Sequence, residues 1–226
     1  MDTDFIILIP SRIGSTRLKN KPLIDISGMT LIERVFKNSF SISSNTFIAT
    51  DSEDILNHVQ TFTQNVVMTS NLHISGTDET LIINLQGDEP FMPKDLVMQL
   101  VNDFYIYHCD VISACHPISD SDDLSNPNCV KVQCNLNNYA ENFQRLTNVK
   151  SSKRHIGIYG YKMKTLRKLI NLKPTENELT HKLEQLRFMD NSYSIYMTSY
   201  KSEVPSGIDT HDDVTKAINF LATYEN

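Results

Sequence analysis

Four cations follow the first apolar stretch of the chain within a few residues. The stretch Phe5-Ile-Ile-Leu-Ile-Pro10 leads into a segment that carries Arg12, Arg17, Lys19 and Lys21, with a glycine and hydroxyl side chains among them. Glycine lets backbone N–H groups approach an anion closely, and the cations neutralise its charge. These residue types suit a ligand with several phosphates, such as a nucleoside triphosphate, whereas the simpler interpretation is a solvated basic loop. The segment is not a Walker A loop, because no Gly-Lys-Ser/Thr follows at the required spacing.

Two aspartates far apart in the chain suit a divalent cation. Asp88 follows an apolar stretch within a Gly-Asp-Glu-Pro sequence, and Asp209 lies within Gly-Ile-Asp-Thr. Carboxylates are ligands of Mg²⁺, and phosphoryl transfer depends on positioning and charge neutralisation. The pair therefore predicts a magnesium site. The alternatives are an acidic turn for Asp88 and a helix N-cap for Asp209, with Thr210 and Asp212 as competing caps.

Three further groups of residues suit other parts of a ligand. The small-residue turn Ser75-Gly-Thr77 would let the backbone approach a flat base, and His155, at the start of a glycine-interrupted strand, would suit an acidic group. Glu184 and Gln185 are neighbours on a predicted helix. The simpler interpretations are an ordinary turn, a structural histidine and exposed helical side chains.

An open α/β fold would position these residues. Five apolar residues that end at a proline predict a strand buried on both faces, and ligands bind at the carboxyl ends of such parallel strands. Strands that alternate with helices predict a mostly parallel sheet flanked by helices, with right-handed crossovers. The predicted strands are 5–10, 46–50, 66–69, 81–85, 110–115, 155–161 and 192–199. The predicted helices are 29–40, one opening at 51–54, one from 93, 176–189 and one after 210. Segments 129–134 and 138–143 predict a hairpin, so the second half is smaller and mixed or antiparallel.

The join between the third and fourth strands is short for a parallel crossover. Residues 70–80 show no helical pattern, whereas a parallel crossover needs about a dozen residues or more. Either the two strands are antiparallel, or a crossover helix is missing. A second short polar join spans 147–154.

Composition indicates a cytoplasmic soluble protein. The chain has 226 residues, 40% of them hydrophobic and 21% charged, which suits one large domain. A net charge of −6 argues against general binding to nucleic acid or anionic membranes, and no apolar run approaches the roughly 18 residues of a membrane span. The acidic start lacks the basic region of a signal peptide, and the four cysteines show no C-x-x-C spacing, which favours free thiols in a reducing compartment.

In combination, these stretches resemble one family, the 3-deoxy-manno-octulosonate (Kdo) cytidylyltransferases. The matching segments occur in family order from end to end, and the ordered set is specific although no single motif is. They include Ile9-Pro-Ser-Arg-Ile-Gly-Ser-Thr-Arg-Leu18, Lys21-Pro-Leu23, Ala49-Thr-Asp51, His73-Ile-Ser-Gly-Thr77, Gln86-Gly-Asp-Glu-Pro90, Asn126-Pro-Asn128, Val130-Lys-Val132, His155-Ile-Gly-Ile-Tyr-Gly-Tyr161, Leu183-Glu-Gln-Leu-Arg187, Glu203-Val-Pro205 and Gly207-Ile-Asp-Thr210.

The resemblance implies a fold, a reaction and an assembly. The fold is an α/β fold of the nucleotide-diphospho-sugar transferase type. The reaction is CTP + Kdo → CMP-Kdo + pyrophosphate with Mg²⁺, in lipopolysaccharide assembly, and the enzyme is a homodimer built from the second half. Residues 1–226 form a single domain, with a nucleotide-binding half at about 1–115, a sugar-binding and dimerisation half at about 116–200, and a return to the main sheet with a C-terminal helix at 201–226.

The resemblance also assigns roles to residues. The residues implied for the nucleotide are Arg12, Ser15, Arg17, Lys21, Ser75, Gly76, Thr77 and Gln86. Those implied for magnesium are Asp88 and Asp209, which with Arg12 and Lys21 form the catalytic set. Those implied for the sugar are His155, Tyr159, Glu184 and Gln185.

The sequence departs from the family pattern in four places. Lys19 is an additional cation, and Asp78-Glu79 runs straight into a strand where the family has an arginine and then a helix. The tract after Phe143-Gln-Arg145 is short, and His181 replaces a glutamate near the sugar residues. These departures leave 8-amino-Kdo as an alternative sugar acid and a catalytically impaired nucleotide-binding relative as an alternative protein. Sialic acid is a further alternative, because its cytidylyltransferases share the fold and the basic first loop.

Overall fold

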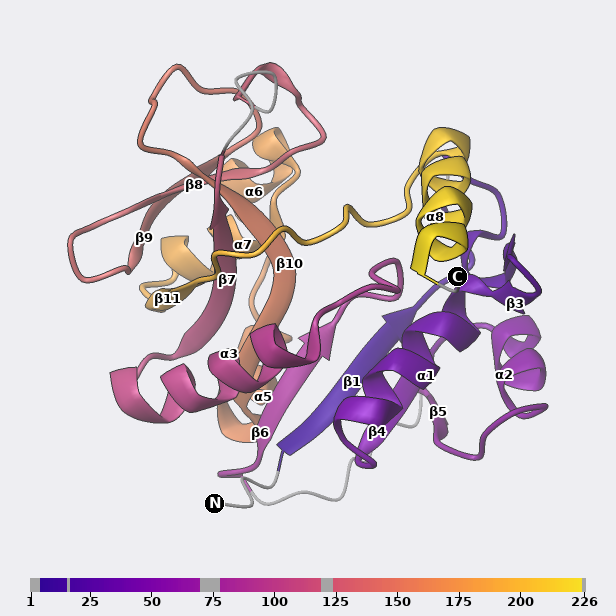
Figure 1. Cartoon of the computed structure of the whole chain (residues 1–226). Helices are drawn as coiled ribbons and strands as arrows, with labels where there is room; N and C mark the ends of the chain where they lie inside the picture. The colour runs from indigo at the N-terminus through magenta and orange to yellow at the C-terminus, as the bar shows by residue number, and fades with distance from the viewer. Residues whose placement is uncertain (1–4, 16, 70–77, 119–123, 225–226) are drawn as a thin grey trace. The chain divides into compact units, whose positions relative to one another are not determined.

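The computed structural model describes residues 5–15, 17–69, 78–118 and 124–224. The chain divides into two compact units (Figure 1). The N-terminal unit comprises Asp4–Ser75, Ile83–Lys94 and Pro205–Asn226, and the central unit comprises Met1–Thr3, Gly76–Ile82 and Asp95–Val204. The functional halves expected at about 1–115 and 116–200 stay a prediction.

The strands of the N-terminal unit run in the order β6-β1-β4-β5. They are β1 (Phe5–Ser11), β4 (Thr46–Thr50), β5 (Val66–Met68) and β6 (Leu81–Leu85), the last of which begins in the central unit. β4 is parallel to both β1 and β5. Ile7 and Ile9 of β1 are fully buried, as expected for a central strand. β1 and β4 separate β5 from β6, so the short join does not make a hairpin, and residues 70–77 of this join lie outside the described residues.

The helices of this unit begin at hydroxyl caps. α1 (Leu31–Ile42) begins after Thr30, whose side chain accepts a hydrogen bond from the backbone N–H of Glu33, and it packs on β1 and β4 (Figure 1). α2 (Glu53–Val59) begins after Ser52 in the same way. α8 (His211–Tyr224) is the predicted C-terminal helix.

Three small elements of this unit were not predicted from the sequence. The 3-10 helix η1 (Lys21–Leu23) follows Asn20, whose φ of 53° is left-handed. β2 (Asp25–Ile26) and β3 (Met29–Thr30) pair in a hairpin around Gly28, which has a φ of 81°. The expected helix 29–40 therefore starts two residues later than predicted.

The central unit contains a mixed sheet. Its strands are β7 (Val111–Pro117), β8 (Lys131–Cys134), β9 (Ala140–Gln144), β10 (Lys153–Lys162) and β11 (Ile195–Ser199). β7 lies between β11, to which it is parallel, and β10, to which it is antiparallel. β8 pairs antiparallel with β10 and with β9, which confirms the predicted hairpin. The α/β class with a mostly parallel first part and a mixed second part is confirmed.

The predicted helix 176–189 is wrong, because the chain forms two helices there. α6 (Glu176–His181) ends at Lys182, whose φ of 52° is left-handed, and α7 (Glu184–Asp190) begins after the extended residue Leu183. Leu183 is buried, and burial of this side chain accompanies the break. The other helices are α3 (Lys94–Tyr107), as expected, and α5 (Met163–Leu169), which was not predicted.

The short join before β6 is anchored to the start of α5. The carboxylate of Glu79 forms ion pairs with Lys162 and Lys164, which lower the pKa of Glu79 to about 2. The backbone N–H of Met163 donates to the carbonyl oxygen of Thr80 at 2.9 Å. These contacts connect residues 79–80 to the start of α5.

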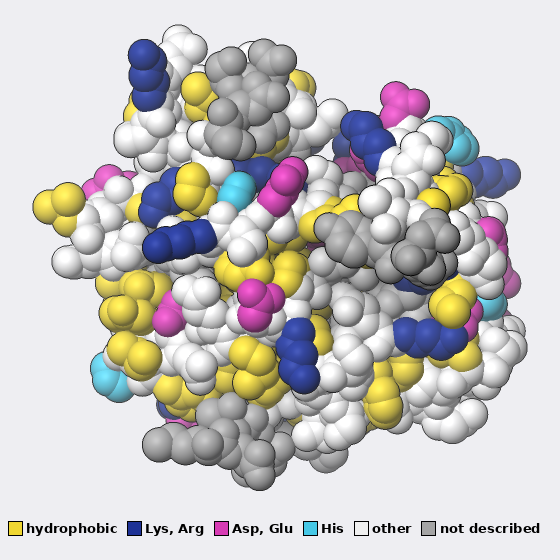
Figure 2. Space-filling view, viewed as in Figure 1, with side chains coloured by type: hydrophobic (Ala, Val, Ile, Leu, Met, Phe, Trp, Pro, Cys, Tyr) yellow, Lys and Arg dark blue, Asp and Glu magenta, His cyan; other side chains and the backbone are white. Residues whose placement is uncertain are grey.

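Exposed apolar side chains gather on one side of the central unit. Figure 2 shows hydrophobic side chains from the β8–β9 hairpin down to the end of α3. Tyr105, Ile106 and Tyr107 at the end of α3 and Leu136 at the hairpin tip are exposed, Ile106 by 62%. The hydroxyl of Tyr139 donates to the carbonyl oxygen of Tyr107 at 2.7 Å and ties the two elements together. We call these four exposed residues the α3–hairpin surface.

None of the described helices is long and apolar enough to cross a membrane.

Candidate active site

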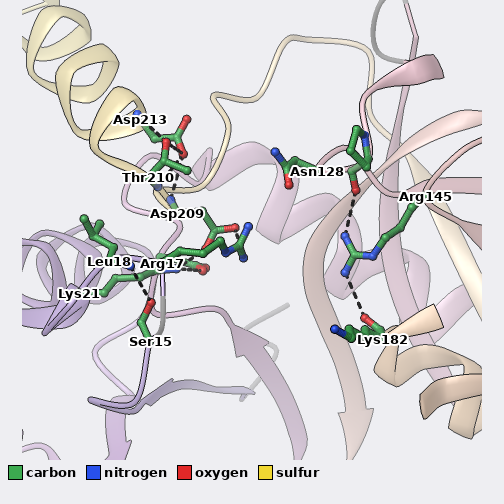
Figure 3. A network of polar contacts seen from close by, with 12 residues as sticks. Ser15, Arg17, Leu18, Lys21, Asn128, Arg145, Lys182, Asp209, Thr210 and Asp213 are labelled. Carbon is green, nitrogen blue, oxygen red and sulfur yellow. Dashed lines mark hydrogen bonds and ion pairs between the residues drawn. The ribbon is translucent and has the colours of Figure 1, made fainter. Parts of the chain in front are cut away.

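Two aspartates far apart in the chain meet at one lysine. Nζ of Lys21 lies 2.5 Å from Oδ2 of Asp88 and 2.7 Å from Oδ1 of Asp209, across separations of 67 and 188 residues. The guanidinium of Arg17 lies 2.9 Å from the other oxygen of Asp209. Figure 3 shows Arg17, Lys21 and Asp209 directed toward one another. The predicted meeting of the two carboxylates and the basic loop is present in the N-terminal unit.

Backbone packing at the end of β6 places Asp88. A Cβ atom at Gly87 would lie 2.7 Å from the carbonyl oxygen of Pro10, so only glycine lets this turn pack on the end of β1. The backbone N–H of Ile208 donates to the carbonyl oxygen of Asp88 at 2.9 Å. This bond brings the segment that carries Asp209 against the turn that carries Asp88.

The local fold of the basic loop places Lys21. Leu18 is buried, and its backbone N–H donates to Oγ of Ser15 at 3.3 Å. The turn at Asn20 and the buried Pro22 then set the direction of η1. Lys21 is half-buried as a result, and Ser15 acts in the structure of the loop itself.

The remaining predicted nucleotide residues lie elsewhere or outside the described part. Arg12 is exposed, and its guanidinium lies 4.0 Å from Asp51, a separation at which an exposed ion pair contributes little. Gln86 donates to the side chain of Asn84 at 3.3 Å. Ser75, Gly76 and Thr77 lie outside the described residues.

The charges of this cluster stabilise one another. Burial opposes the charge of Lys21, but the carboxylates of Asp88 and Asp209 outweigh burial and raise the pKa of Lys21. Burial likewise opposes ionisation of Asp209, but Lys21 and Arg17 hold the pKa of Asp209 below its ordinary value. The site therefore presents ionised groups at neutral pH.

The donor set at Lys21 fits magnesium held together with a phosphate ligand. Mg²⁺ is usually bound by one or two carboxylates plus water and substrate phosphates. Asp88 and Asp209 converge on one cation, the ammonium of Lys21, and they supply such a pair. Among the described residues, no group of three or more His, Cys, Asp or Glu residues could hold a metal by itself. The carboxylate pair would thus need further oxygen ligands from a substrate.

A second cluster in the central unit contains three of the predicted sugar residues. Nε2 of His155 lies 2.9 Å from Oγ of Ser113, and this hydroxyl donates to the carbonyl oxygen of Ile158 at 2.8 Å. The hydroxyl therefore accepts from the Nε2–H group of His155, which leaves Nδ1 as an acceptor. Burial lowers the pKa of His155 to about 4, so the ring is neutral at neutral pH.

Tyr159 connects His155 to α7. Its ring lies 5.5 Å from that of His155, and its hydroxyl lies 3.4 Å from Oε1 of the buried Gln185. Burial, and then the negative charge of Glu184, raise the pKa of Tyr159, so its hydroxyl keeps its proton. Glu184 is exposed at the first position of α7.

Arg145 and Lys131, for which the sequence suggested no role, hold the backbone beside this cluster. The guanidinium of Arg145 donates to the carbonyl oxygen of Lys182 at 3.1 Å (Figure 3). It also donates to the carbonyl oxygens of Pro127 at 3.0 Å and His181 at 3.3 Å. Nζ of the fully buried Lys131 donates to the carbonyl oxygen of Arg145 at 2.6 Å. For Lys131, the sequence did contain a signal of burial, because this lysine lies between two valines in a predicted strand.

The chain matches a family model and curated relatives over most of its length. The model described as cytidylyltransferase matches residues 6–198. The 3-deoxy-manno-octulosonate cytidylyltransferase of Psychromonas ingrahamii is 35% identical over 252 residues, which cover 96% of this chain and 99% of the relative. That of Francisella tularensis subsp. novicida is 36% identical and covers 93% and 95%.

The chain belongs to the 3-deoxy-manno-octulosonate cytidylyltransferase family.

Solved structures agree with this membership. A structure of CMP:2-keto-3-deoxy-manno-octonic acid synthetase complexed with CTP has a TM-score of 0.85 and 31% identity, and the match covers 98% of this chain and 99% of that chain. A 4-diphosphocytidyl-2C-methyl-D-erythritol synthase from Anaerococcus prevotii has a TM-score of 0.62 at 14% identity, which shows a shared fold alone.

This cytidylyltransferase family member is shorter than the relative from Psychromonas. The alignment spans 252 positions although this chain has 226 residues, so the relative carries residues that have no counterpart here.

Proposed function

We propose that this cytidylyltransferase transfers CMP from CTP to the anomeric hydroxyl of Kdo and releases pyrophosphate. The observation that carries the proposal is the meeting of Asp88 and Asp209 at Lys21, next to a loop of further cations. Membership in the family, and a solved relative complexed with CTP, support cytidine as the base.

The N-terminal unit would hold the triphosphate. Arg17 and Lys21 carry the charges that phosphate oxygens require, and Arg12 lies exposed in the same loop. Asp88 and Asp209 would hold Mg²⁺, which when bound neutralises charge on the phosphates. Phosphoryl transfer is catalysed mainly by positioning and by charge stabilisation, and these side chains supply both.

The central unit would hold the sugar acid. Neutral His155 offers Nδ1 as an acceptor, protonated Tyr159 and Gln185 offer polar groups, and exposed Glu184 can accept from sugar hydroxyls. In the reaction, the anomeric oxygen forms a bond to the α-phosphorus while the bond to pyrophosphate breaks, and the proton of the hydroxyl passes to solvent water.

The experiment is a pyrophosphate-release assay with CTP and Mg²⁺, run in parallel with Kdo, 8-amino-Kdo and sialic acid. We expect the highest kcat/KM with Kdo. The alternative of 8-amino-Kdo depends on His181, which replaces a glutamate of the family pattern. His181 is exposed on α6, and its backbone carbonyl oxygen accepts a hydrogen bond from Arg145. A higher kcat/KM with another sugar acid would replace Kdo in the proposal. No release with any sugar, from protein that still binds CTP, would identify a catalytically impaired relative.

We also propose a homodimer that forms through the α3–hairpin surface, because Ile106 and Leu136 of this surface are apolar and exposed. Light scattering after size exclusion should give twice the chain mass of 25.8 kDa for the wild type and the single mass for Ile106→Asp or Leu136→Asp. Ile170→Asp, which changes an apolar residue 67% exposed after α5, is the matched control and should stay dimeric. A monomeric wild type would contradict the proposal.

The protein would act in the cytoplasm, and its product would be used in lipopolysaccharide assembly. Both the pathway and the location are inferences from the family resemblance and from the sequence composition.

A further inference from the structure

The start of α8 holds the backbone of Asp209 by hydrogen bonds to one carboxylate. Oδ2 of Asp213 accepts from the backbone N–H groups of Asp209 at 3.1 Å and of Thr210 at 2.9 Å, and from the hydroxyl of Thr210 at 2.8 Å (Figure 3). In return, the backbone N–H of Asp213 donates to Oγ1 of Thr210 at 3.3 Å.

This arrangement extends an ordinary capping box. In a capping box, the N-cap and N3 side chains satisfy one another's backbone N–H groups, here Thr210 and Asp213. The additional bond reaches one residue farther back, to Asp209. A cap alone would not require it.

Asp209 is consequently held on both sides. On one side the backbone N–H of Ile208 donates to Asp88, and on the other Asp213 accepts from the backbone of Asp209. Between these two anchors, the carboxylate of Asp209 is directed toward Arg17 and Lys21.

We propose that Asp213 is a positioning residue. It orients the carboxylate of Asp209 so that this carboxylate and that of Asp88 can bind the same divalent cation. The inference rests on the proposed function, because it takes Asp209 to be a ligand of the divalent cation. Outer-shell groups that hold a metal ligand typically change metal affinity by about 10- to 100-fold when they are removed. Loss of Asp213 should therefore weaken binding of the metal, even though Asp213 is not one of its ligands.

The test measures metal binding without turnover. Mn²⁺ is titrated into the protein with CTP and no sugar, and free Mn²⁺ is followed by its EPR signal. Asp213→Ala should raise the Kd for Mn²⁺ by about tenfold. Asp213→Asn keeps one acceptor oxygen and should raise it less. In the assay, kcat should fall in the same order while the KM for the sugar stays near that of the wild type.

Thr30→Ala is the matched control. Thr30 caps α1 in the same unit, and its hydroxyl also bonds to His58, so this variant loses a helix cap outside the segment of Asp209 and should lower Tm without changing the Kd for Mn²⁺. Wild-type Kd values in both Asp213 variants would overturn the positioning role and leave the proposed function standing, as would an equal rise in Kd with Thr30→Ala. A wild type that turns over without binding Mn²⁺ or Mg²⁺ would overturn the metal assignment itself.

Discussion

Nζ of Lys21 lies 2.5 Å from Oδ2 of Asp88, and Asp209 approaches the same ammonium from the other end of the chain. The two carboxylates are thus held together by an internal cation at the place where a divalent cation would bind. A metal ion that enters without nucleotide has to compete with this ammonium. A triphosphate would give Lys21 another anionic partner and so ease entry of the metal.

Replacing Lys21 should separate metal binding from nucleotide binding. Lys21→Met leaves two neighbouring carboxylates without their shared ammonium, so the Kd for Mn²⁺ measured by EPR without CTP should fall by about tenfold, equivalent to about 1.4 kcal/mol. CTP should bind more weakly, because the variant lacks a triphosphate cation. Lys19→Met, in the same loop, is the matched control and should bind Mn²⁺ as the wild type does. An unchanged Kd in Lys21→Met would contradict competition between the ammonium and the metal.

Lys19 itself should have a small effect on catalysis. It is exposed, and salt screens an exposed charge strongly. Lys19→Ala should raise the KM for CTP by about two- to threefold and leave kcat unchanged in the pyrophosphate assay. A large loss of kcat would place Lys19 at the reacting phosphates and contradict its assignment.

Gly87 should be intolerant of a side chain. A Cβ atom would lie 2.7 Å from a backbone oxygen of β1, which cannot move aside as a flexible side chain would. Gly87→Ala should lower the free energy of unfolding by about 1–3 kcal/mol in urea denaturation and should also reduce kcat, because the turn carries Asp88. Gly14→Ala has open space around its Cβ and should leave stability near that of the wild type. Equal stability of the two variants would contradict the close packing.

His155 should have little effect on the pH dependence of stability near neutral pH, and it should lower the free energy of unfolding in acid. Its pKa is about 4 in the folded chain and 6.5 as an ordinary side chain, so between these values the unfolded chain binds a proton that the folded chain does not. Stability should therefore fall as pH decreases through this window. An NMR titration of the ring should give a midpoint near 4, and a midpoint near 6.5 would contradict the half-buried, neutral ring.

How far the sequence predicts the structure depends on the kind of signal involved. The strands β4 and β6 were predicted with their bounds, because burial on both faces leaves short segments rich in apolar residues. The break at Lys182 was not predicted, because helical periodicity continues across it without glycine or proline. The left-handed turn there is a tertiary effect.

The candidate site shows the same limit. The motifs identified Lys21, Asp88 and Asp209, but not that one ammonium joins both carboxylates, because this depends on packing between distant segments. The role of Arg145 in holding neighbouring backbone segments was not predicted. Arg145 donates to backbone carbonyl oxygens, and every residue type has such an oxygen, so the sequence does not indicate the partners.

The most direct test compares kcat for pyrophosphate release in Asp88→Asn, Asp209→Asn and the wild type with saturating CTP, Mg²⁺ and Kdo, with circular dichroism to verify the fold. Asp212→Asn, a change at an exposed carboxylate in the same segment as Asp209, is the matched control. We predict that each of the first two variants loses about a hundredfold or more in kcat, because a ligand of the metal contributes several kcal/mol to charge stabilisation, while the control stays near the wild type. A folded Asp88→Asn or Asp209→Asn variant with wild-type kcat would contradict the claim that these two carboxylates hold the catalytic metal.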